Sequence, residues 1–260
     1  MPVPAEVAEF AEGLSAYTFD SPSYDRIFGD GYVIGVPVHG PYLSVQRIRL
    51  VQRQIPAVVE HARTVMRERG KTVCSWWVSD WSTPPGIERL LLAEGLSKNC
   101  RDYDVAALVL AAAPPAPPEE VETARVTSLN DYLEAAAVAQ LAFGIPADRW
   151  PTREEQEADY ALETDGRASA SFIARIGGRI VGVGRTFFGP RGALLAGGAT
   201  HPDARGRGVY RALVHARWNE AVTRGTPALV VQAGAMSEPI LKRLGFAEVC
   251  RFRRLEDALG

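Results

Sequence analysis

A glycine and arginine turn stands directly before a stretch with helical periodicity, and this segment most constrains the chain. Residues 200–218 read THPDARGRGVYRALVHARW. Gly206 and Gly208 have no Cβ, so the backbone can turn tightly there and approach an anion closely. From Val209 the apolar residues recur at helical spacing, so the first N–H groups of that helix have no intrahelical partner. The segment predicts a phosphate-binding turn at a helix N-terminus.

Arg205 and Arg207 add positive charge to this turn. The helix dipole contributes about 0.3–1 kcal/mol, and each hydrogen bond to a charged group about 1.5–3 kcal/mol. Several converging amides with two guanidinium groups can therefore hold a diphosphate. An Arg-Gly-Arg-Gly run also occurs in surface loops and RNA-binding tails, so the flanking segments decide between these readings.

The flanking segments follow a specific order. Residues 193–200, ALLAGGAT, predict a buried strand before the turn. Residues 228–233, ALVVQA, predict a strand after the helix, followed by a short helix from about Met236 and by Leu-Gly-Phe at 244–246. The expected order is strand, glycine turn, helix, strand, short helix.

This order resembles the GNAT superfamily of acetyl-CoA-dependent N-acetyltransferases, over roughly residues 121–257. The family's pyrophosphate motif, Arg/Gln-x-x-Gly-x-Gly/Ala, is matched by Arg205 and Gly208, with Tyr210 in the last place. The resemblance implies acetyl-CoA as co-substrate, no metal, and direct attack of a primary amine on the thioester in a ternary complex. It implies cofactor contacts at Gly198, Ala199, Thr200, His201, Arg205, Gly206, Arg207, Gly208, Val209, Tyr210 and Ser237.

The chain departs from the family in its last helix. Many members carry a tyrosine four residues before the glycine of Leu-Gly-Phe, where it protonates the departing thiolate, and this chain has Leu241 there. Gly234 replaces an asparagine, which leaves Ser237 as the nearest hydroxyl for the cofactor arm. The acid is then Ser237 or Tyr210, or the thiolate departs directly. We also expect room for a tyrosine at position 241.

The general base has several candidates. His201 follows the strand that the resemblance places at the thioester, and a histidine titrates near neutral pH. A water molecule is another candidate. The acidic helix that follows the loop 143–151 offers Glu154, Glu155, Glu157, Asp159 and Tyr160. The candidate catalytic residues are therefore His201, Ser237 and Tyr210.

A proline-rich stretch divides the chain. Residues 111–120 read AAAPPAPPEE, and prolines at this density continue neither a helix nor a strand. We expect a domain over residues 1–112, a linker over 113–120 and an acetyltransferase domain over 121–260. Residues 71–78, 85–96 and 103–110 predict strand, helix and strand, as the end of the chain does. The fold class is a mixed α/β sheet in two GNAT-like domains, with an unrelated α/β cap as the alternative for the first.

The first domain is expected to be degenerate. Its helix over residues 52–69 follows YLSVQRIRL, which contains no glycine. Long and β-branched residues cannot bring successive amides onto a pyrophosphate. We therefore expect one cofactor per chain. The tryptophans Trp76, Trp77 and Trp81 are interpreted as core or domain-interface residues.

Composition narrows the remaining classes. The chain of 260 residues is 47% hydrophobic and 23% charged, with a net charge of −2, which gives no reason to expect nucleic-acid or membrane binding. No secretory signal is apparent, so we expect a cytoplasmic protein. Cys74, Cys100 and Cys250 match no metal spacing and are interpreted as reduced thiols.

The acceptor is expected to be a small-molecule or peptide amine, with its pocket between the lid over residues 143–162 and Phe187 and Phe188. The acidic lid favours a cationic amine. A homodimer stays open. Two other classes also stay open: a non-catalytic acyl-CoA sensor, motivated by Leu241, and an interaction module that binds no CoA.

Overall fold

The computed structural model describes residues 3–17, 24–98, 102–163, 168–226 and 228–259. The chain forms two compact units: unit 1 comprises Met1–Val109 with Gln232–Gly260, and unit 2 comprises Leu110–Val231. This division differs from the expected one at its end, because residues 232–260 belong with the first part of the chain rather than with residues 121–231.

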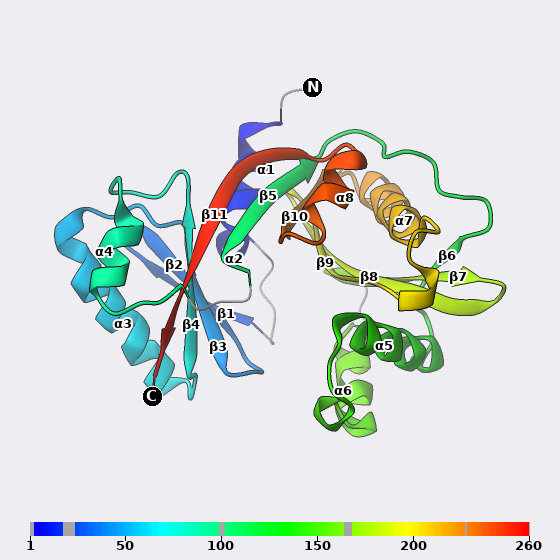
Figure 1. The fold of residues 1–260 in the computed structure, drawn as a ribbon, viewed down its shortest axis with the longest axis horizontal. Coiled ribbons are helices and arrows are strands. Elements are labelled where there is room, and N and C mark those ends of the chain that lie inside the picture. Colours follow the sequence, from blue (N-terminus) through cyan, green and yellow to red (C-terminus); the bar gives the residue numbers. More distant parts are fainter. Residues whose placement is uncertain (1–2, 18–23, 99–101, 164–167, 227, 260) are drawn as a thin grey trace. The chain divides into compact units, whose positions relative to one another are not determined.

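The sheet of unit 1 explains this difference. Its strands follow the order β1 (Tyr24–Gly29), β2 (Tyr32–Pro37), β3 (Tyr42–Gln46), β4 (Val73–Ser79), β11 (Ala247–Ala258) and β5 (Asp104–Leu110). The C-terminal strand β11 is antiparallel to both β4 and β5, so backbone hydrogen bonds on its two edges hold it in unit 1 (Figure 1).

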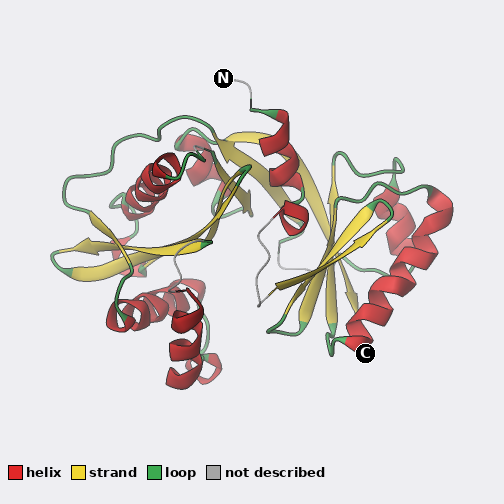
Figure 2. Ribbon diagram, turned by 180° about the vertical axis from the view of Figure 1, so that it is seen from behind, coloured by secondary structure: helices red, strands yellow, loops and turns green. Residues whose placement is uncertain are grey.

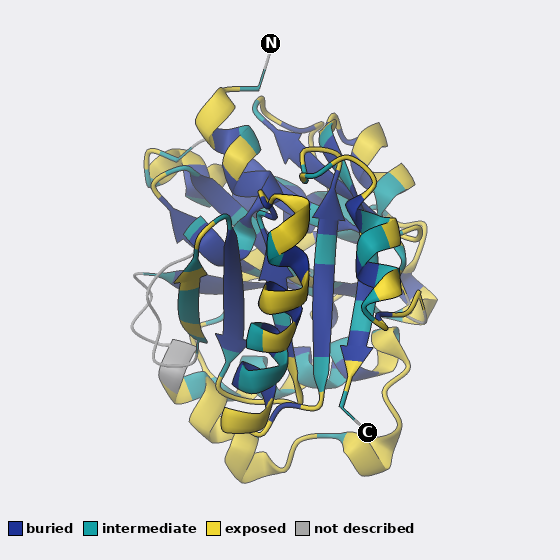
Figure 3. Cartoon of the chain, turned by 90° about the vertical axis from the view of Figure 1, so that its left-hand side faces the viewer, coloured by how far each residue is buried: buried dark blue, intermediate teal, exposed yellow. Residues whose placement is uncertain are grey.

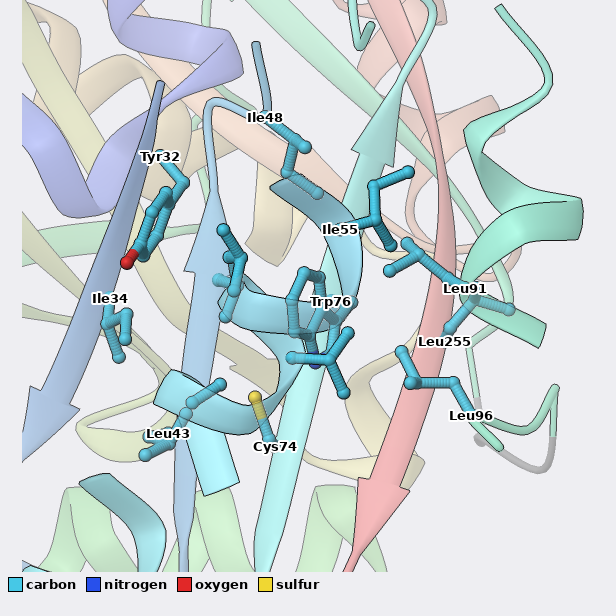
Figure 4. Close-up of a cluster of buried hydrophobic side chains, with 14 of the residues drawn as sticks. Tyr32, Ile34, Leu43, Ile48, Ile55, Cys74, Trp76, Leu91, Leu96 and Leu255 are labelled. Carbon is cyan, nitrogen blue, oxygen red and sulfur yellow. The ribbon is translucent and has the colours of Figure 1, made fainter. Parts of the chain in front are cut away.

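Helices cover both faces of this sheet. The helices α3 (Ile55–Glu68) and α4 (Ile87–Ala93) pack on one face, whereas α1 (Ala5–Glu12) and α2 (Leu14–Tyr17) lie on the other (Figure 2). The core beneath α3 and α4 gathers Ile34, Leu43, Leu91 and Leu255 around the fully buried Trp76 (Figure 4). Figure 3 shows the buried strands behind helices whose outer faces are exposed.

The tryptophans divide between core and surface. Trp76 is a core residue, as predicted. Trp77 packs edge-on against Phe252, with the Arg254 guanidinium over its ring. Trp81 is exposed at 37%, so its interpretation as a core residue is wrong. Cys74 and Cys250 are buried free thiols, and burial raises the pKa of both. Cys100 lies outside the described residues.

The strands of unit 2 carry one helical layer on each face. They follow the order β10 (Leu229–Ala233), β9 (Gly192–Thr200), β8 (Arg179–Gly189), β7 (Ser169–Ile176) and β6 (Glu122–Arg125). The helices α5 (Leu129–Phe143) and α6 (Arg153–Glu163) lie on one side and α7 (Val209–Thr223) on the other (Figure 1). Alternate residues of β8 face the two layers, because Val183 packs with the α5 cluster while Gly182 faces Val209 of α7.

The elements of unit 2 match the sequence prediction closely. A Gly-Gly dipeptide predicts a two-residue hairpin turn, and Gly177-Gly178 joins the strands 169–176 and 179–189. The helix α7 begins at Val209, as predicted. In unit 1, the helix predicted over 85–96 is shorter, because Gly86 is left-handed and α4 begins only at Ile87. The elements α1 to β2 were not predicted.

A charge network fastens the helix α8 (Glu238–Arg243) to β11 and β5 within unit 1. Arg251 donates to Glu238 at 2.6 Å, to Glu248 at 2.7 Å and to Asp104 at 2.9 Å. Lys242 donates to Glu238 at 2.7 Å. Hydrogen bonds from Arg251 first, and then from Lys242, lower the pKa of Glu238 from 4.5 to about 2. The network therefore stabilises the fold where Glu238 is ionised.

We expect Arg251→Met to lower the free energy of unfolding at pH 7 by about 1–2 kcal/mol, since Glu238 then lies only 17% exposed beside fewer donors. Because the folded-state pKa is depressed, the contribution is present above pH 4.5 and is lost as the pH falls toward 2. Urea unfolding of the wild type and of Arg251→Met at pH 7 and pH 3 measures this contribution to the free energy of unfolding.

Arg253→Met is the matched control, because Arg253 is 48% exposed and its nearest carboxylates lie at 3.7 and 3.9 Å. Its effect should be close to zero at both pH values. A difference between wild type and Arg251→Met that stays constant from pH 7 to pH 3 would contradict the assignment of the network to Glu238.

Candidate functional site

The turn before α7 has the backbone that the glycines predicted. Gly206 has φ of +79° and Gly208 has φ of +74°, and both are left-handed conformations that favour glycine. A short 3-10 turn, Pro202–Ala204, leads into them, with Ala204 N donating to His201 O at 2.9 Å. Arg205, Gly206 and Arg207 are exposed. The first-turn amides of α7 therefore face an accessible turn.

Two contacts at this turn were not foreseen from the sequence. Arg205 Nη2 donates to Ala142 O at 3.3 Å, so this guanidinium satisfies a carbonyl at the C-terminal end of α5. A Cβ built on Gly208 would lie 2.4 Å from Pro118 Cγ. The proline-rich segment is therefore more than a spacer, because Pro118 packs on the turn itself.

The strand before the turn separates from its parallel neighbour. β9 pairs with β10 at Ala193 and Leu194, and then continues to Thr200 against β8. The register between β8 and β9 shifts between Val183 and Arg185, and Gly197 on the opposite strand has φ of +56°. A bulge at Gly197 and Gly198 thus lies on the part of β9 beyond its pairing with β10. This is the splayed arrangement that the resemblance implied.

The corresponding strand of unit 1 is not splayed. β3 pairs with β4 from Tyr42 to Val45. Beyond the strand, Thr83 N donates to Ile48 O at 3.0 Å, and Leu50 N donates to Thr83 O at 3.2 Å. These hydrogen bonds occupy the backbone groups that a cofactor arm would use. The lack of a glycine turn in the sequence and the paired strand edge in the structure therefore both argue against a cofactor site in unit 1.

Two side chains of α7 fill hollows left by glycines in the strands of unit 2. A Cβ on Gly198 would lie 2.8 Å from Tyr210 Cε2, and one on Gly184 would lie 2.8 Å from Arg217 Nη1. Arg217 is fully buried, which lowers the pKa of its guanidinium, while the neighbouring Tyr210 opposes this shift. Sequence reasoning missed Arg217. Its only sequence signal is the glycine pair of GVGRT at residues 182–186, because a glycine in a strand marks a bulge or a close approach.

His201 lies at the end of β9 beside the turn. Arg179 Nη2 lies 3.1 Å from His201 Nε2, and Asp203 N lies 3.3 Å from Nδ1. A neutral imidazole has one acceptor nitrogen, so His201 accepts either from Arg179 through Nε2 or from Asp203 N through Nδ1, depending on its tautomer. The structure thus places His201 beside the turn before α7, with Arg179 and Asp203 as its neighbours.

The acidic helix α6 is a solvent-facing helix with local partners. Glu155 accepts from Thr152 N at 2.7 Å, and this backbone hydrogen bond lowers its pKa, so Glu155 caps the helix. Glu157 pairs with Arg153 at 2.7 Å. Tyr160 packs on Tyr132, with ring centroids 5.4 Å apart. Glu154 and Asp159 are exposed.

Phe187 and Phe188, the expected wall of the acceptor pocket, point to opposite faces of β8. Phe188 is 4% exposed, and the Arg224 guanidinium lies 3.9 Å from its ring centroid on the α7 side. Phe187 lies partly exposed, with Arg185 over its ring at 4.7 Å. The loop after α5 exposes Phe143 at 42% and Ile145 at 39%. The side chain of Leu162 lies outside the described residues.

The last helix, α8, belongs to unit 1. Ser237 precedes its first residue without a side-chain capping hydrogen bond, and its Oγ donates to Gly234 O at 3.4 Å. A Cβ on Gly234 would lie 2.8 Å from Asp102 Oδ1. Leu241 is fully buried. The expectation of room for a tyrosine at position 241 is therefore wrong, because the leucine is enclosed by core packing.

Metal-ligating side chains do not gather in threes in the described part of the chain. None of the described helices is long and apolar enough to cross a membrane.

Comparisons with known proteins agree with this geometry. The family model of the acetyltransferase (GNAT) family matches residues 135–246. A GCN5-related N-acetyltransferase from Kribbella flavida is similar over 98% of this chain and 96% of its own, at 16% identity and a TM-score of 0.72.

A tandem GNAT protein from the clavulanic acid biosynthesis pathway is similar over 100% of this chain and 90% of its own, at 17% identity and a TM-score of 0.63. A GCN5-related N-acetyltransferase from Sphaerobacter thermophilus is similar over 88% of this chain and 76% of its own, at 17% identity and a TM-score of 0.66. At these identities the likeness shows the fold: a mixed α/β GNAT fold, of which one relative is a tandem form. Among curated proteins, no sequence matches this chain significantly.

Proposed function

We propose that the chain transfers an acetyl group from acetyl-CoA to a primary amine, since residues 135–246 match the family model of the acetyltransferase (GNAT) family. The observation that carries the proposal is the pairing of two features in unit 2. The left-handed turn at Gly206 and Gly208 opens α7, and β9, which leads into that turn, extends past its pairing with β10. One feature suits a pyrophosphate and the other an extended pantetheine arm.

The proposed cofactor contacts follow from this geometry. The α7 amides at Val209 and Tyr210, with Gly208 and Arg207, hold the pyrophosphate, and Arg205 orients the turn through Ala142. The backbone of Gly198 to His201 serves the thioester end. Preorganised amides at a developing oxyanion are worth about 2.7–4 kcal/mol each.

The chemistry needs no metal ion in this scheme. A neutral amine attacks the activated thioester carbon, its proton passes to water or a base, and the thiolate leaves. We propose water as the first proton acceptor, because the Arg179 guanidinium lies 3.1 Å from His201 Nε2 and competes with the amine for this nitrogen. The acceptor is proposed to be a small-molecule or peptide amine.

A panel of amines assayed by free-thiol release tests this function, with calorimetry of CoA binding beside it. Acetyl transfer to at least one amine is the expected result. CoA binding without transfer to any amine would instead support an acyl-CoA sensor. Failure to bind CoA at all would support an interaction module.

We expect CoA to bind with a stoichiometry of one per chain. In unit 1, backbone hydrogen bonds of Thr83 to Ile48 and Leu50 occupy the strand edge where a second arm would lie. Calorimetric titration of the full chain measures the stoichiometry. Saturation at two equivalents would show that unit 1 retains a working site.

A further inference from the structure

Tyr210 and Arg217 project from the same side of α7 toward the sheet of unit 2, seven residues and about two turns apart. Tyr210 lies over Gly198 of β9, where a built Cβ would be 2.8 Å from Cε2 and 3.4 Å from the hydroxyl oxygen. Arg217 lies over Gly184 of β8, where a built Cβ would be 2.8 Å from Nη1. Only glycine at these two strand positions leaves space for these side chains.

The two hollows adjoin. Val183 pairs with Ala199 and Arg185 with Ala196, so Gly184 lies opposite the bulge at Gly197 and Gly198. The Arg217 guanidinium carbon is 5.9 Å from the centroid of the Tyr210 ring. The phenol and the cation therefore lie beside each other, over the segment of β9 that extends past its pairing with β10.

The guanidinium of Arg217 is costly where it lies. It is fully buried, and Nε donates to Leu213 O at 3.0 Å. Among the described residues, Nη1 and Nη2 have no hydrogen-bond partner of ordinary geometry, although the neighbouring Tyr210 side chain raises the pKa of the guanidinium. A buried guanidinium with only one of its three nitrogens in such a hydrogen bond is costly for a fold, and apolar residues of similar volume are better tolerated there. The charge is therefore better explained by a role in the reaction than by folding.

We propose that Tyr210 protonates the departing thiolate of CoA and that Arg217 is its positioning residue. This inference rests on the proposed acetyl transfer. Leu241 has no hydroxyl and is enclosed in unit 1, whereas the Tyr210 hydroxyl lies over the β9 bulge beside the proposed thioester site. A fixed cation beside the phenol stabilises the tyrosinate that proton donation produces.

The proton balance of the step closes. The amine nitrogen bonds to the thioester carbon and gives up one proton to water. When the tetrahedral intermediate collapses, the C–S bond breaks, its electron pair goes to sulfur, and the Tyr210 hydroxyl supplies the proton that makes the CoA thiol. The tyrosinate then regains a proton through water, equal to the one that the nitrogen released. Amine and acetyl-CoA thus give amide and CoA.

The first test replaces Tyr210 with phenylalanine, which keeps the ring over Gly198 and removes the hydroxyl. With an amine accepted by the wild type, kcat should fall by about 10²-fold or more, with KM for acetyl-CoA within about twofold, because general acid catalysis is worth about 10²–10⁴-fold. Tyr42→Phe is the matched control, since Tyr42 is an exposed residue of unit 1, and it should keep wild-type kcat.

A binding test needs no acceptor. Calorimetry compares CoA with desulfo-CoA, which lacks the sulfur. The wild type should bind CoA severalfold more tightly than desulfo-CoA, because the Tyr210 hydroxyl contacts the sulfur. Tyr210→Phe should bind both equally. A ratio unchanged by the substitution would overturn the placement of Tyr210 at the thiol.

Arg217→Met separates positioning from packing. A side chain needed only for packing should lower the unfolding temperature when replaced. We expect Arg217→Met to raise the unfolding temperature, to lower kcat by about tenfold and to leave KM for acetyl-CoA unchanged, with partial recovery of kcat in Arg217→Lys. The double variant with Tyr210→Phe should be no slower than Tyr210→Phe alone.

The outcomes distinguish the two levels of the proposal. CoA binding with no acetyl transfer by the wild type overturns the proposed function and this inference with it. Wild-type kcat in Tyr210→Phe overturns only the inference. Additive losses in the double variant, or a lowered unfolding temperature in Arg217→Met, remove Arg217 from the positioning role.

Discussion

Replacing Gly208 with valine is expected to weaken CoA binding by at least about 10²-fold. Gly208 has φ of +74°, and a Cβ there would lie 2.4 Å from Pro118 Cγ. A β-branched residue would therefore strain the backbone, displace the proline-rich segment and put bulk where the phosphate meets the α7 amides. Calorimetry of CoA binding measures the loss, and unchanged affinity would remove the turn from the cofactor site.

The chain offers a matched control for the strain itself. Gly225 follows the C-terminal end of the same helix with φ of +72°, and a Cβ there meets nothing within 4 Å. Gly225→Val should cost about 1–2 kcal/mol of stability from the left-handed backbone and leave CoA affinity unchanged. Gly206→Val, which also meets nothing within 4 Å, tests the turn without disturbing Pro118 and should weaken CoA binding.

Replacing Leu241 with tyrosine is expected to lower the free energy of unfolding by about 1–3 kcal/mol. Leu241 is fully buried, so a larger side chain must displace neighbours in unit 1 or strain its own rotamer. No gain in turnover is expected, because the enclosed side chain cannot present a hydroxyl without disrupting this packing. Urea unfolding and thiol release measure the two effects.

Ile240→Tyr is the control on the same helix. Ile240 is 39% exposed, so a tyrosine can project into solvent and should change stability by less than about 0.5 kcal/mol. A Leu241→Tyr protein as stable as the wild type and faster in turnover would restore the earlier expectation that the site accepts the family tyrosine.

Local sequence signals were sufficient where one segment contains its own structural cause. The Gly177-Gly178 dipeptide joins β7 and β8, and both glycines have positive φ, as a tight hairpin requires. Gly206 and Gly208 likewise specify the left-handed turn before α7. These features depend on missing Cβ atoms and on short-range periodicity, which are visible in a single sequence.

Only the tertiary structure decided the features that join distant residues. Phe252 of β11 pairs with Ser79 and with Val105, so hydrogen bonds across long sequence separations place the C-terminal strand in unit 1. The tertiary structure also decided the environment of Leu241, because the sequence alone does not tell whether an apolar side chain lines a pocket or lies in a core.

The hollows at Gly184 and Gly198 show most directly what a single sequence cannot predict. A glycine in a strand predicts a bulge or a close approach, but the sequence does not say which side chain approaches. Arg217 and Tyr210 meet these glycines because α7 crosses β8 and β9 there, and an arginine on a helix is ordinarily exposed. The sequence by itself determined the turn, the hairpin and the order of elements in unit 2. The three-dimensional packing determined which unit received the last strand and which charged group was buried.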